Sequence, residues 1–348
     1  MAQGKRLTLG QIGEFGLIQR VERIFGRPNR PGLVQGIGDD AAVVKIGHNK
    51  ALLYTTDILI EDVHFSLKYE GFLDIGWKAL AVNISDIASM GATPTWGVIS
   101  VGVPVSIPVD NVDKLAQGVA KLARKYRIGI IGGDTVKSPD RLVVNIALLG
   151  EAPVQDILYR HGASPGDALF VTNRVGEAAA GLAVLKDRWQ LAVNGWPKIK
   201  KQIVKKYLRP EPRVKESVLI VKNKLASSMI DISDGLHISI KLLCARSKVG
   251  ARVYLDKIPL NKQLSPPKAD QPLAETINYQ HALQLALSGG EDYELLFTVP
   301  QNKIRKALAL FPHGWIGEIT KDKICKVLDQ NGREVITRNT GYEHFKTK

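Results

Sequence analysis

Apolar residues in the first part of the chain switch between helical spacing and short continuous runs, which predicts mixed α and β structure. Helical spacing covers three segments: residues 12–25, 74–92 and 112–126. Short apolar runs predict strands in four others: residues 50–57, 95–105, 128–135 and 141–150. Because helices and strands alternate along the chain, the pattern indicates an α/β domain.

The second half repeats this mixture after residues 151–167, which are rich in turn residues and lack periodicity. Strands are predicted at residues 168–172, 227–231, 251–255 and 293–299. Helices are predicted at residues 177–187, 235–245, 281–290 and 302–311, and a solvated loop at 261–274. A length of 348 residues also favours two domains. We therefore predict two mixed α/β domains, residues 1–150 and 151–348.

A membrane segment is not predicted. The uncharged run from Ile87 to Val109 is long enough to span a bilayer. It contains Pro94, Pro104 and Pro108, so we interpret it as a helix end, a turn and a buried strand. Lys5 and Arg6 are followed by a mixed segment rather than an apolar signal core. We expect a cytoplasmic protein that does not bind membranes.

The net positive charge of the chain is compatible with several classes of binding partner and does not select one. The formal net charge is +14, which permits binding to nucleic acid, anionic membrane or phosphorylated substrates. A basic RNA-binding protein would interleave Lys and Arg with exposed aromatic residues. Only 6% of the residues are aromatic and no such pattern occurs, so we expect no nucleic-acid partner. The two cysteines show no CxxC spacing, and reduced thiols are the default interpretation.

Carboxylates recur beside apolar or glycine-rich sequence, and this is the chain's main chemical signal. A single aspartate at such a place is usually a helix cap or a turn residue. Several carboxylates brought together repel, and one must protonate unless cations lie between them. Several Mg²⁺ ions holding a polyphosphate would explain many acids at one site. The six stretches contain Asp39 and Asp40; Asp57, Glu61 and Asp62; Asp86; Asp134; Asp231 and Asp234; and Glu291 and Asp292.

Glycines accompany three of these stretches, GIGDD, IGGDT and LSGGED. Glycine lets backbone N–H groups approach a phosphate, although each stretch alone is equally explained by a tight turn. In DISDGL, period-two alternation places Asp231 and Ser233 on one side of a strand. Asp234 then falls near a helix start, where the helix dipole favours a negative group.

Several common nucleotide and hydrolase motifs are missing from the sequence. The chain has no GxxxxGK[ST] P-loop, no GxSxG elbow and no HExxH zinc motif. LSGGE is similar to an ABC transporter signature, but without a P-loop we regard the match as chance. A lone histidine is more often structural, and the acidic neighbours of His64 leave both roles open.

Ten motifs in order resemble those of thiamine-monophosphate kinase, a family related to aminoimidazole ribonucleotide synthetase and selenophosphate synthetase. They span nearly the whole chain: GEFGLI, GIGDDAAV, TTD…VHF, KALAVNISDIASMGA, IGGDT, GASPGD, LRPEPRV, DISDGL, SGGEDYELLFTV and GYEHF. The resemblance implies ATP-dependent conversion of thiamine monophosphate to thiamine diphosphate, with release of ADP. It also implies a homodimer in which the N-terminal domains' sheets form a barrel, while the C-terminal α/β domain completes the active site.

The resemblance assigns residues to three groups. The implied Mg²⁺ ligands are Asp40, Thr55, Thr56, Asp57, Asp86, Asp134, Asp231 and Asp234. The implied ATP contacts are Gly133, Asp134, Arg160 and Ser233, and the implied thiamine monophosphate contacts are His64, Glu291 and Tyr342. Asp39 is left open between a ligand and a partner of Asp40. Asp134 and Asp231 are the implied catalytic residues, acting through metal rather than as general base or nucleophile.

Two positions depart from the family pattern: Asp62 and Asn173 each stand where the family often has glycine. Asp62 would make the pocket rim more acidic, and Asn173 leaves the role of its loop open. Selenophosphate synthetases need a reactive cysteine near the N-terminus, and hydrogenase maturation relatives end in cysteine; this chain has neither. Aminoimidazole ribonucleotide synthetase remains the alternative function.

The attacking group in the implied reaction is a phosphate oxygen. A phosphate monoester has a second pKa of about 6, so it is mostly a dianion at neutral pH and needs no protein base. The sequence agrees, since it has many acids but no persuasive Ser–His or Cys–His pair. We expect direct in-line transfer of the γ-phosphoryl group, assisted by several Mg²⁺ ions.

Overall fold

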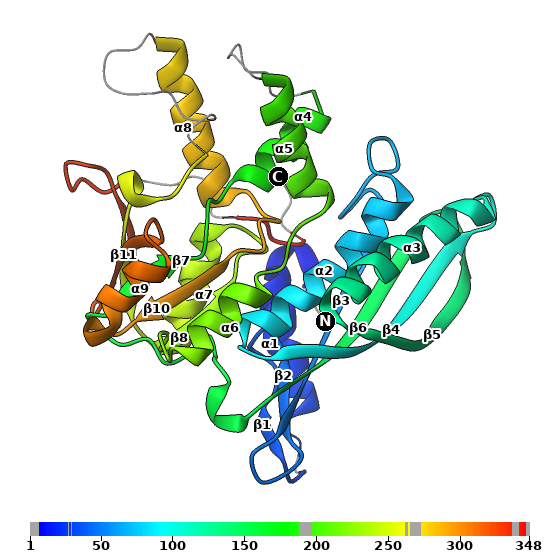
Figure 1. The fold of residues 1–348 in the computed structure, drawn as a ribbon, viewed down its shortest axis with the longest axis horizontal. Coiled ribbons are helices and arrows are strands. Elements are labelled where there is room, and N and C mark those ends of the chain that lie inside the picture. Colours follow the sequence, from blue (N-terminus) through cyan, green and yellow to red (C-terminus); the bar gives the residue numbers. More distant parts are fainter. Residues whose placement is uncertain are drawn as a thin grey trace, which may run out of the picture.

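Two six-stranded mixed sheets carry the fold, and in Figure 1 they lie side by side. The computed structural model describes residues 7–26, 28, 30–187, 196–261, 264, 273–335 and 341–345. The first sheet has the order β1-β2-β3-β6-β4-β5 and the second the order β12-β9-β11-β7-β10-β8. A mixed α/β architecture with two domains is therefore confirmed.

The first sheet consists of β1 (Leu33–Gln35), β2 (Ala42–Lys45), β3 (Ala51–Ile60), β4 (Thr93–Pro104), β5 (Gly129–Ser138) and β6 (Val143–Ala152). Its helices are α1 (Leu9–Phe25), α2 (Phe72–Ser89) and α3 (Val109–Tyr126). Helix α2 contacts β3, β6 and α3, and it also touches β8 and α6 of the second domain. This position between the domains explains why the helix is buried on almost all sides.

Two glycines set the distance between α2 and α3. A Cβ on Gly76 would lie 2.0 Å from the carbonyl oxygen of Leu115, and one on Gly118 would lie 2.1 Å from that of Leu73. Larger residues would force the helices apart. The run Ile87–Val109 forms the end of α2, a turn and strand β4, as predicted. In the described part of the chain, no helix combines the length and the apolar character needed to cross a membrane.

The second sheet consists of β7 (Ala168–Val171), β8 (Ser228–Asp231), β9 (Gly250–Tyr254), β10 (Leu295–Val299), β11 (Trp315–Thr320) and β12 (Cys325–Leu328). Its helices are α4 (Glu177–Leu185), α5 (Trp196–Leu208), α6 (Val214–Lys222), α7 (Leu236–Ser247), α8 (Leu273–Ser288) and α9 (Ile304–Leu310). β7, β8 and β10 are buried along their whole length, and β7 and β10 are almost entirely apolar in sequence.

Most of the predicted loop at 261–274 lies outside the described residues, and α8 begins at Leu273. The domain limit at residue 150 stays a prediction.

The segment 208–214, LRPEPRV, connects the two domains. Trp77 Nε1 of α2 donates a 2.8 Å hydrogen bond to the carbonyl oxygen of Pro210. The hydroxyl of Tyr126, at the end of α3, donates to Glu211 Oε1 at 2.6 Å. Arg213 Nε reaches Glu294 Oε2, just before β10, at 2.7 Å. The segment thus fastens α2 and α3 to the second sheet.

One face of the first sheet is exposed although it carries large apolar side chains. Tyr54, Trp96 and Ile131 are 45%, 49% and 64% exposed, and all three line a pocket of about 400 Å³. β5 is an edge strand and extends away from the second sheet in Figure 1. The described strands of this sheet do not close into a barrel within one chain. The dimeric barrel stays a prediction.

Candidate active site

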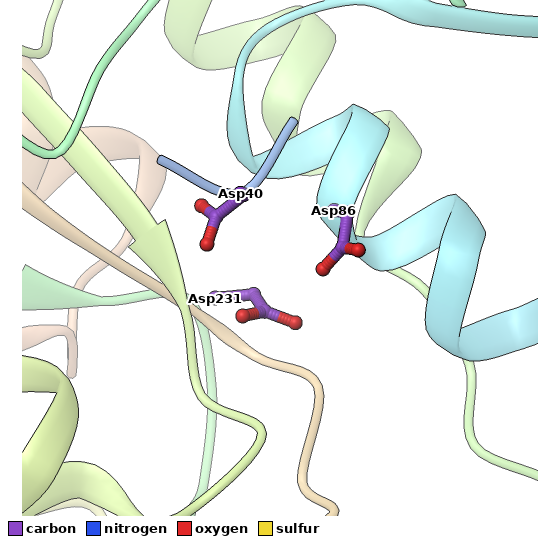
Figure 2. Close-up of side chains that lie close together, drawn as sticks. All are labelled: Asp40, Asp86 and Asp231. Carbon is purple, nitrogen blue, oxygen red and sulfur yellow. The ribbon is translucent and has the colours of Figure 1, made fainter. Parts of the chain in front are cut away.

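Three carboxylates from distant parts of the chain lie together between the domains (Figure 2). Asp40 lies in the loop before β2, Asp86 near the end of α2, and Asp231 at the end of β8. Each offers one oxygen, and these oxygens all lie within 4.8 Å of one another. Figure 2 shows the side chains converging on one space, as a shared cation would require.

Each carboxylate is oriented by one hydroxyl group. Ser89 Oγ donates to Asp40 Oδ2 at 2.5 Å, and Ser85 Oγ donates to Asp231 Oδ2 at 2.6 Å. Thr55 Oγ1 of β3 donates to Asp86 Oδ2 at 2.5 Å. Helix α2 therefore supplies one carboxylate of the cluster and the hydroxyl groups that hold the other two.

The electrostatics of this cluster are unfavourable without a cation. Burial, followed by the charge of Asp40, raises the pKa of Asp231 to about 8. Burial and Asp57 raise the pKa of Asp86 well above its ordinary value. Hard oxygen donors at this spacing fit Mg²⁺ or a similar hard cation. A cation at this point would remove the repulsion and let all three carboxylates ionise.

Arg160 closes one side of the cluster. Its Nε donates to Asp40 Oδ1 at 3.0 Å, and its Nη2 contacts the same oxygen. Its backbone N–H donates to Asp39 Oδ2 at 3.1 Å, and the N–H of Asp40 donates to Asp39 Oδ1 at 3.0 Å. Burial and Asp40 raise the pKa of Asp39 to about 7. The carboxylate of Asp39 thus supports the loop that carries Asp40.

Asp57 and Asp234 border the three carboxylates. Asp57 lies on the same side of β3 as Thr55, and its backbone N–H donates to Asn83 Oδ1 at 3.1 Å. Burial and Asp40 raise the pKa of Asp57 to about 6. Asp234 lies in the turn before α7, where burial, Glu14 and Asp57 raise its pKa to about 7. The acidic region therefore extends from the cluster toward α1.

Thr56 and Asp134 do not join this cluster within one chain. Thr56 points to the opposite face of β3, where Asn145 Nδ2 donates to its Oγ1 at 2.9 Å. Asp134 is exposed on β5, and its pairing partner Ser100 is also paired with Asn145. Asp134 thus shares the exposed face with Thr56. Three strand spacings separate it from β3, or about 14 Å.

Gly133 and Ser233 are both placed by backbone contacts. A Cβ on Gly133 would lie 1.7 Å from the carbonyl oxygen of Ile99, so the pairing of β5 with β4 already requires glycine. β8 ends at Asp231, and Ser233 lies in the following turn instead of on the strand. The carbonyl oxygen of Ser233 accepts a 2.6 Å hydrogen bond from the N–H of Glu291. This bond ties the loop of Glu291 to the loop of Asp234.

An aromatic group lies beside the acidic region. The rings of His64 and His344 have centroids 5.3 Å apart, and Tyr342 meets His344 edge-on at 4.9 Å. Tyr342 N–H donates to the carbonyl oxygen of Asp234 at 3.0 Å. The pKa of Tyr342 is raised by burial, Asp234, Glu14 and Glu291. Residues 341–345 therefore bring an aromatic surface next to the carboxylates.

A backbone hydrogen bond fixes the tautomer of the neutral His64 ring. Its Nδ1 accepts the N–H of Ile60 at 3.0 Å, so the neutral ring carries its proton on Nε2. Burial and His344 lower the pKa of His64, which favours this neutral form.

A buried lysine, Lys78, contacts Glu291 of the site, and the sequence analysis did not predict this role. Its Nζ is 2.9 Å from Glu291 Oε2 and 3.1 Å from Glu70 Oε2. It also lies 3.5 Å from the ring centroid of Tyr207. One signal could have revealed it: Lys78 is the single basic residue of the helical run at 74–92, and apolar residues flank it. His344 and Glu14 were also missed, although His344 stands within the quoted motif GYEHF.

Two acids from the same stretches have structural roles. Asp292 accepts the N–H groups of Gly176 and Ala178 at 2.6 and 3.1 Å, which caps the start of α4. Glu61 Oε2 accepts the N–H of Leu142 at 3.0 Å.

The structure also explains one departure from the family pattern. Asp62 has φ 64°, a left-handed conformation that favours glycine. Its carboxylate pairs with Arg141 Nη1 at 2.5 Å, which offsets the added charge. Asn173 lies exposed in the bend after β7.

Comparison with known proteins gives a consistent result across the chain. Residues 38–152 match the family described as AIR synthase related protein, N-terminal domain, and residues 164–330 match its C-terminal domain.

Two curated relatives are called thiamine-monophosphate kinase. The one from Escherichia coli strain K12 is 37% identical over 345 residues, covering 96% of this chain and 99% of its own. The one from Buchnera aphidicola subsp. Schizaphis graminum is 35% identical over 340 residues, with the same two coverages.

A solved structure, AaThiL complexed with AMPPCP and TMP, is similar over the full length. Its TM-score is 0.80 and its sequence identity 30%, covering 99% of this chain and 100% of that one.

Proposed function

The chain belongs to the thiamine-monophosphate kinase family, and we propose that it transfers the γ-phosphoryl group of ATP to thiamine monophosphate, giving thiamine diphosphate and ADP. One observation carries the proposal. The carboxylate cluster of Asp40, Asp86 and Asp231 lies beside an aromatic surface that contains Tyr342, and the carboxylate of Glu291 lies near that surface. The carboxylate cluster could bind a polyphosphate through cations, and the aromatic surface with its carboxylate could bind a cationic ring. A relative of the same fold binds AMPPCP, an ATP analogue, together with TMP.

Metal binding is assigned to the acidic cluster and its border. Asp40, Asp86 and Asp231 would hold Mg²⁺, with Asp57 and Asp234 extending the site and Thr55 as a further oxygen donor. Magnesium bound there would supply positive charge between the two phosphate groups. The hydroxyl groups of Ser85 and Ser89 fix the carboxylates before metal arrives, so little reorganisation is needed.

The nucleotide is assigned to the Arg160 side of the cluster. The guanidinium of Arg160 is held by Asp40, which leaves its remaining donors available to a phosphate oxygen. Ser233 lies in the turn after Asp231 and could donate its hydroxyl to the same ligand. Gly133 and Asp134 also belong to this proposed set, and their distance from the cluster requires a second chain, as argued below.

Thiamine monophosphate is assigned to the aromatic side. Tyr342 is 46% exposed and could stack on the cationic thiazolium ring. Glu291 would face the ring with its carboxylate, which Lys78 holds in place. The neutral His64 would donate a hydrogen bond from Nε2. This arrangement points the acceptor phosphate toward Asp234 and the carboxylate cluster.

The chemistry needs no protein base. The acceptor is a phosphate monoester with a second pKa of about 6, so its attacking oxygen already carries negative charge. The residues of the chain therefore bind and align the two anions for one in-line displacement. An ATP chirally labelled at the γ-phosphorus should give inverted configuration in the product. Retention, or a phosphorylated side chain trapped in the reaction, would contradict a single displacement.

We also propose that the protein is a homodimer through the exposed face of the first sheet. Tyr54, Trp96, Val98, Ile131 and Val136 are apolar residues that this face or the adjoining edge strand exposes. An exposed apolar edge strand is normally covered in a stable protein. A second copy pairing there would cover the pocket lined by Trp96 and Ile131 and join the two open sheets.

The experiment that tests the function is a coupled assay for ADP release. Thiamine monophosphate should support turnover, while thiamine and aminoimidazole precursors should not. Turnover should require Mg²⁺ and should yield thiamine diphosphate by chromatography. Activity with an aminoimidazole precursor alone would instead assign the alternative, aminoimidazole ribonucleotide synthetase.

A further inference from the structure

A second pocket lies at the C-terminal end of α7 and contains both cysteines of the chain. A pocket of about 520 Å³ is lined by Cys244 and Cys325 together with Lys241, Lys248 and Lys323. Cys244 is buried, and Cys325 is partly exposed. None of the eight lining residues is acidic. The pocket therefore combines two thiols with a concentration of positive charge.

The fold brings these thiols together from positions 81 residues apart. α7 carries Cys244 near its C-terminal end, and β12 begins at Cys325, which pairs with Ala251 of β9. A Cβ on Gly250 would lie 2.5 Å from the carbonyl oxygen of Ile324 and 2.6 Å from its nitrogen. Glycine thus permits close packing of the connection after α7 against the residues before β12. Both cysteine side chains line this one pocket.

The two thiols have different chemical characters. The neighbouring thiol of Cys244 lowers the pKa of Cys325, and the charge of Lys241 lowers it further. The neighbouring thiol of Cys325, together with burial, raises the pKa of Cys244. Asp322 opposes the effect on Cys325, but its carboxylate is engaged by Thr320 Oγ1 at 2.6 Å. A partly exposed thiol with a lowered pKa beside a buried thiol is the arrangement of an attacking and a resolving cysteine.

We propose that Cys325 and Cys244 form a thiol–disulfide exchange site that reacts with small anionic disulfides. The thiolate of Cys325 attacks one sulfur of the small disulfide, whose S–S bond breaks and releases one thiolate. Cys244 then loses its proton and attacks the sulfur of Cys325, releasing the second thiol. The protein loses two hydrogen atoms and gains a Cys244–Cys325 bond, while the small disulfide is reduced to two thiols. The three lysines would attract the anionic reactant.

The test uses the whole protein and oxidised glutathione, whose carboxylates make it anionic. Wild-type protein should lose both free thiols and two hydrogen atoms by intact mass, and dithiothreitol should restore both. Cys244→Ser should stop at a stable mixed disulfide on Cys325. Cys325→Ser should leave Cys244 unreacted. A wild-type protein that keeps both thiols, or that accumulates the mixed disulfide, would overturn the proposal.

A comparison of an anionic with a neutral disulfide tests the role of the lysines without replacing either cysteine. Lys248→Gln combined with Lys323→Gln should slow the reaction with oxidised glutathione about tenfold, and neither lysine influences the pKa of Cys325. The reaction with neutral 2-hydroxyethyl disulfide should keep its wild-type rate, which also shows that the variant is folded. Raising the salt concentration should slow only the anionic reactant with wild-type protein. Equal slowing of both reactants, or of neither, would contradict attraction by the pocket.

Discussion

Lys78 Nζ and Glu291 Oε2 lie 2.9 Å apart across the boundary between the two domains. Lys78 is 1% exposed, and its second carboxylate partner, Glu70, is fully buried. A charge at this depth is tolerated because it is paired and because it lies over the ring of Tyr207. Since Glu291 is assigned to thiamine monophosphate, Lys78 is expected to position that carboxylate rather than touch the substrate.

Replacing Lys78 with methionine should remove this support. Glu291 and Glu70 would be left buried without a cation, which costs about 3–5 kcal/mol of unfolding free energy. Without Lys78 the pKa of Glu291 should rise further above its unfolded value, so stability is retained in acid and lost as the pH rises. Urea unfolding should therefore show a larger deficit at pH 8 than at pH 5.

A matched variant separates this effect from the loss of one lysine. Lys121 is exposed on α3, and Lys121→Met should unfold within about 0.5 kcal/mol of the wild type at both pH values. In the kinase assay Lys78→Met should raise the KM for thiamine monophosphate more than that for ATP. Equal effects on both substrates would argue that Lys78 only stabilises the fold.

The acidic cluster predicts an unusual pH dependence for the metal-free protein. Burial and neighbouring carboxylates raise the pKa values of Asp57, Asp234 and Asp231 to about 6, 7 and 8. An unfolded aspartate titrates at about pH 3.9, so the folded state holds extra protons between about pH 4 and 8. Stability in EDTA should fall as the pH rises through this range. Mg²⁺ competes with these protons and should raise the melting temperature more at pH 8 than at pH 5.5.

Asp86→Asn is the variant that checks this interpretation. Removing one carboxylate lowers the repulsion, so the metal-free melting temperature at pH 8 should be higher than that of the wild type. The rise on adding Mg²⁺ should be much smaller, and most kinase activity should be lost. A wild-type response to Mg²⁺ in Asp86→Asn would remove that residue from the metal set.

Tyr342 should contribute to substrate affinity through its ring. Cation–π attraction to a thiazolium is worth roughly 0.5–2 kcal/mol, so Tyr342→Ala should weaken binding of thiamine monophosphate about tenfold. Tyr342→Phe keeps the ring and should bind within about twofold of the wild type. The affinity for ATP should not change in either variant. If Tyr342→Ala binds the substrate normally, the ring only packs against His344.

Much of the fold could be predicted because local patterns dominate it. The predicted strands at 50–57, 95–105, 128–135 and 141–150 correspond to β3, β4, β5 and β6. β1 and β2 have three and four residues, too few for a periodic signal. α5 was missed although Ile199, Ile203 and Tyr207 are buried at four-residue spacing, because its lysines mask the apolar stripe.

The site could be predicted only in part, since pairing between distant segments decides the rest. The aspartates of the cluster stood out by their neighbours, whereas the importance of Lys78 depends on Glu70 and Glu291 meeting it. The face of Asp134 depends on an irregularity between β4 and β5, where Gly97 pairs with Ile130 but Val98 pairs with Gly132. This extra residue turns Asp134 to the exposed face. No local pattern in the sequence indicates it.

The position of the segment 208–214, which connects the two domains, should depend on Arg213. Its partner Glu294 is 1% exposed and also accepts the hydroxyl of Thr172 at 2.7 Å. Arg213→Met would leave this carboxylate buried without its main cation and should cost about 3–5 kcal/mol in urea unfolding. Lys215→Met, on the exposed side of α6, is the control and should cost less than about 0.5 kcal/mol. Equal losses in the two variants would contradict a structural role for the Arg213–Glu294 pair.

Asp134 offers the sharpest test of the proposed dimer. Its side chain shares the exposed sheet face with Thr56, and about 14 Å of sheet separates it from β3. If it serves an active site, we expect that site to belong to the second chain. Asp134→Asn and Asp86→Asn should each be nearly inactive alone.

Mixing those two variants should then restore activity. In a mixed dimer, one site would combine the intact Asp86 of one chain with the intact Asp134 of the other, while the second site would carry both defects. Random exchange of subunits makes half of the dimers mixed, so about one quarter of the wild-type activity should return. The matched control mixes Asp86→Asn with Asp231→Asn, two residues of one cluster in one chain, and should restore nothing. Ile131→Lys, placed in the exposed face, should give a monomer by light scattering and abolish the recovery. If Asp134→Asn and Asp86→Asn fail to complement although their subunits exchange, Asp134 does not act across the dimer.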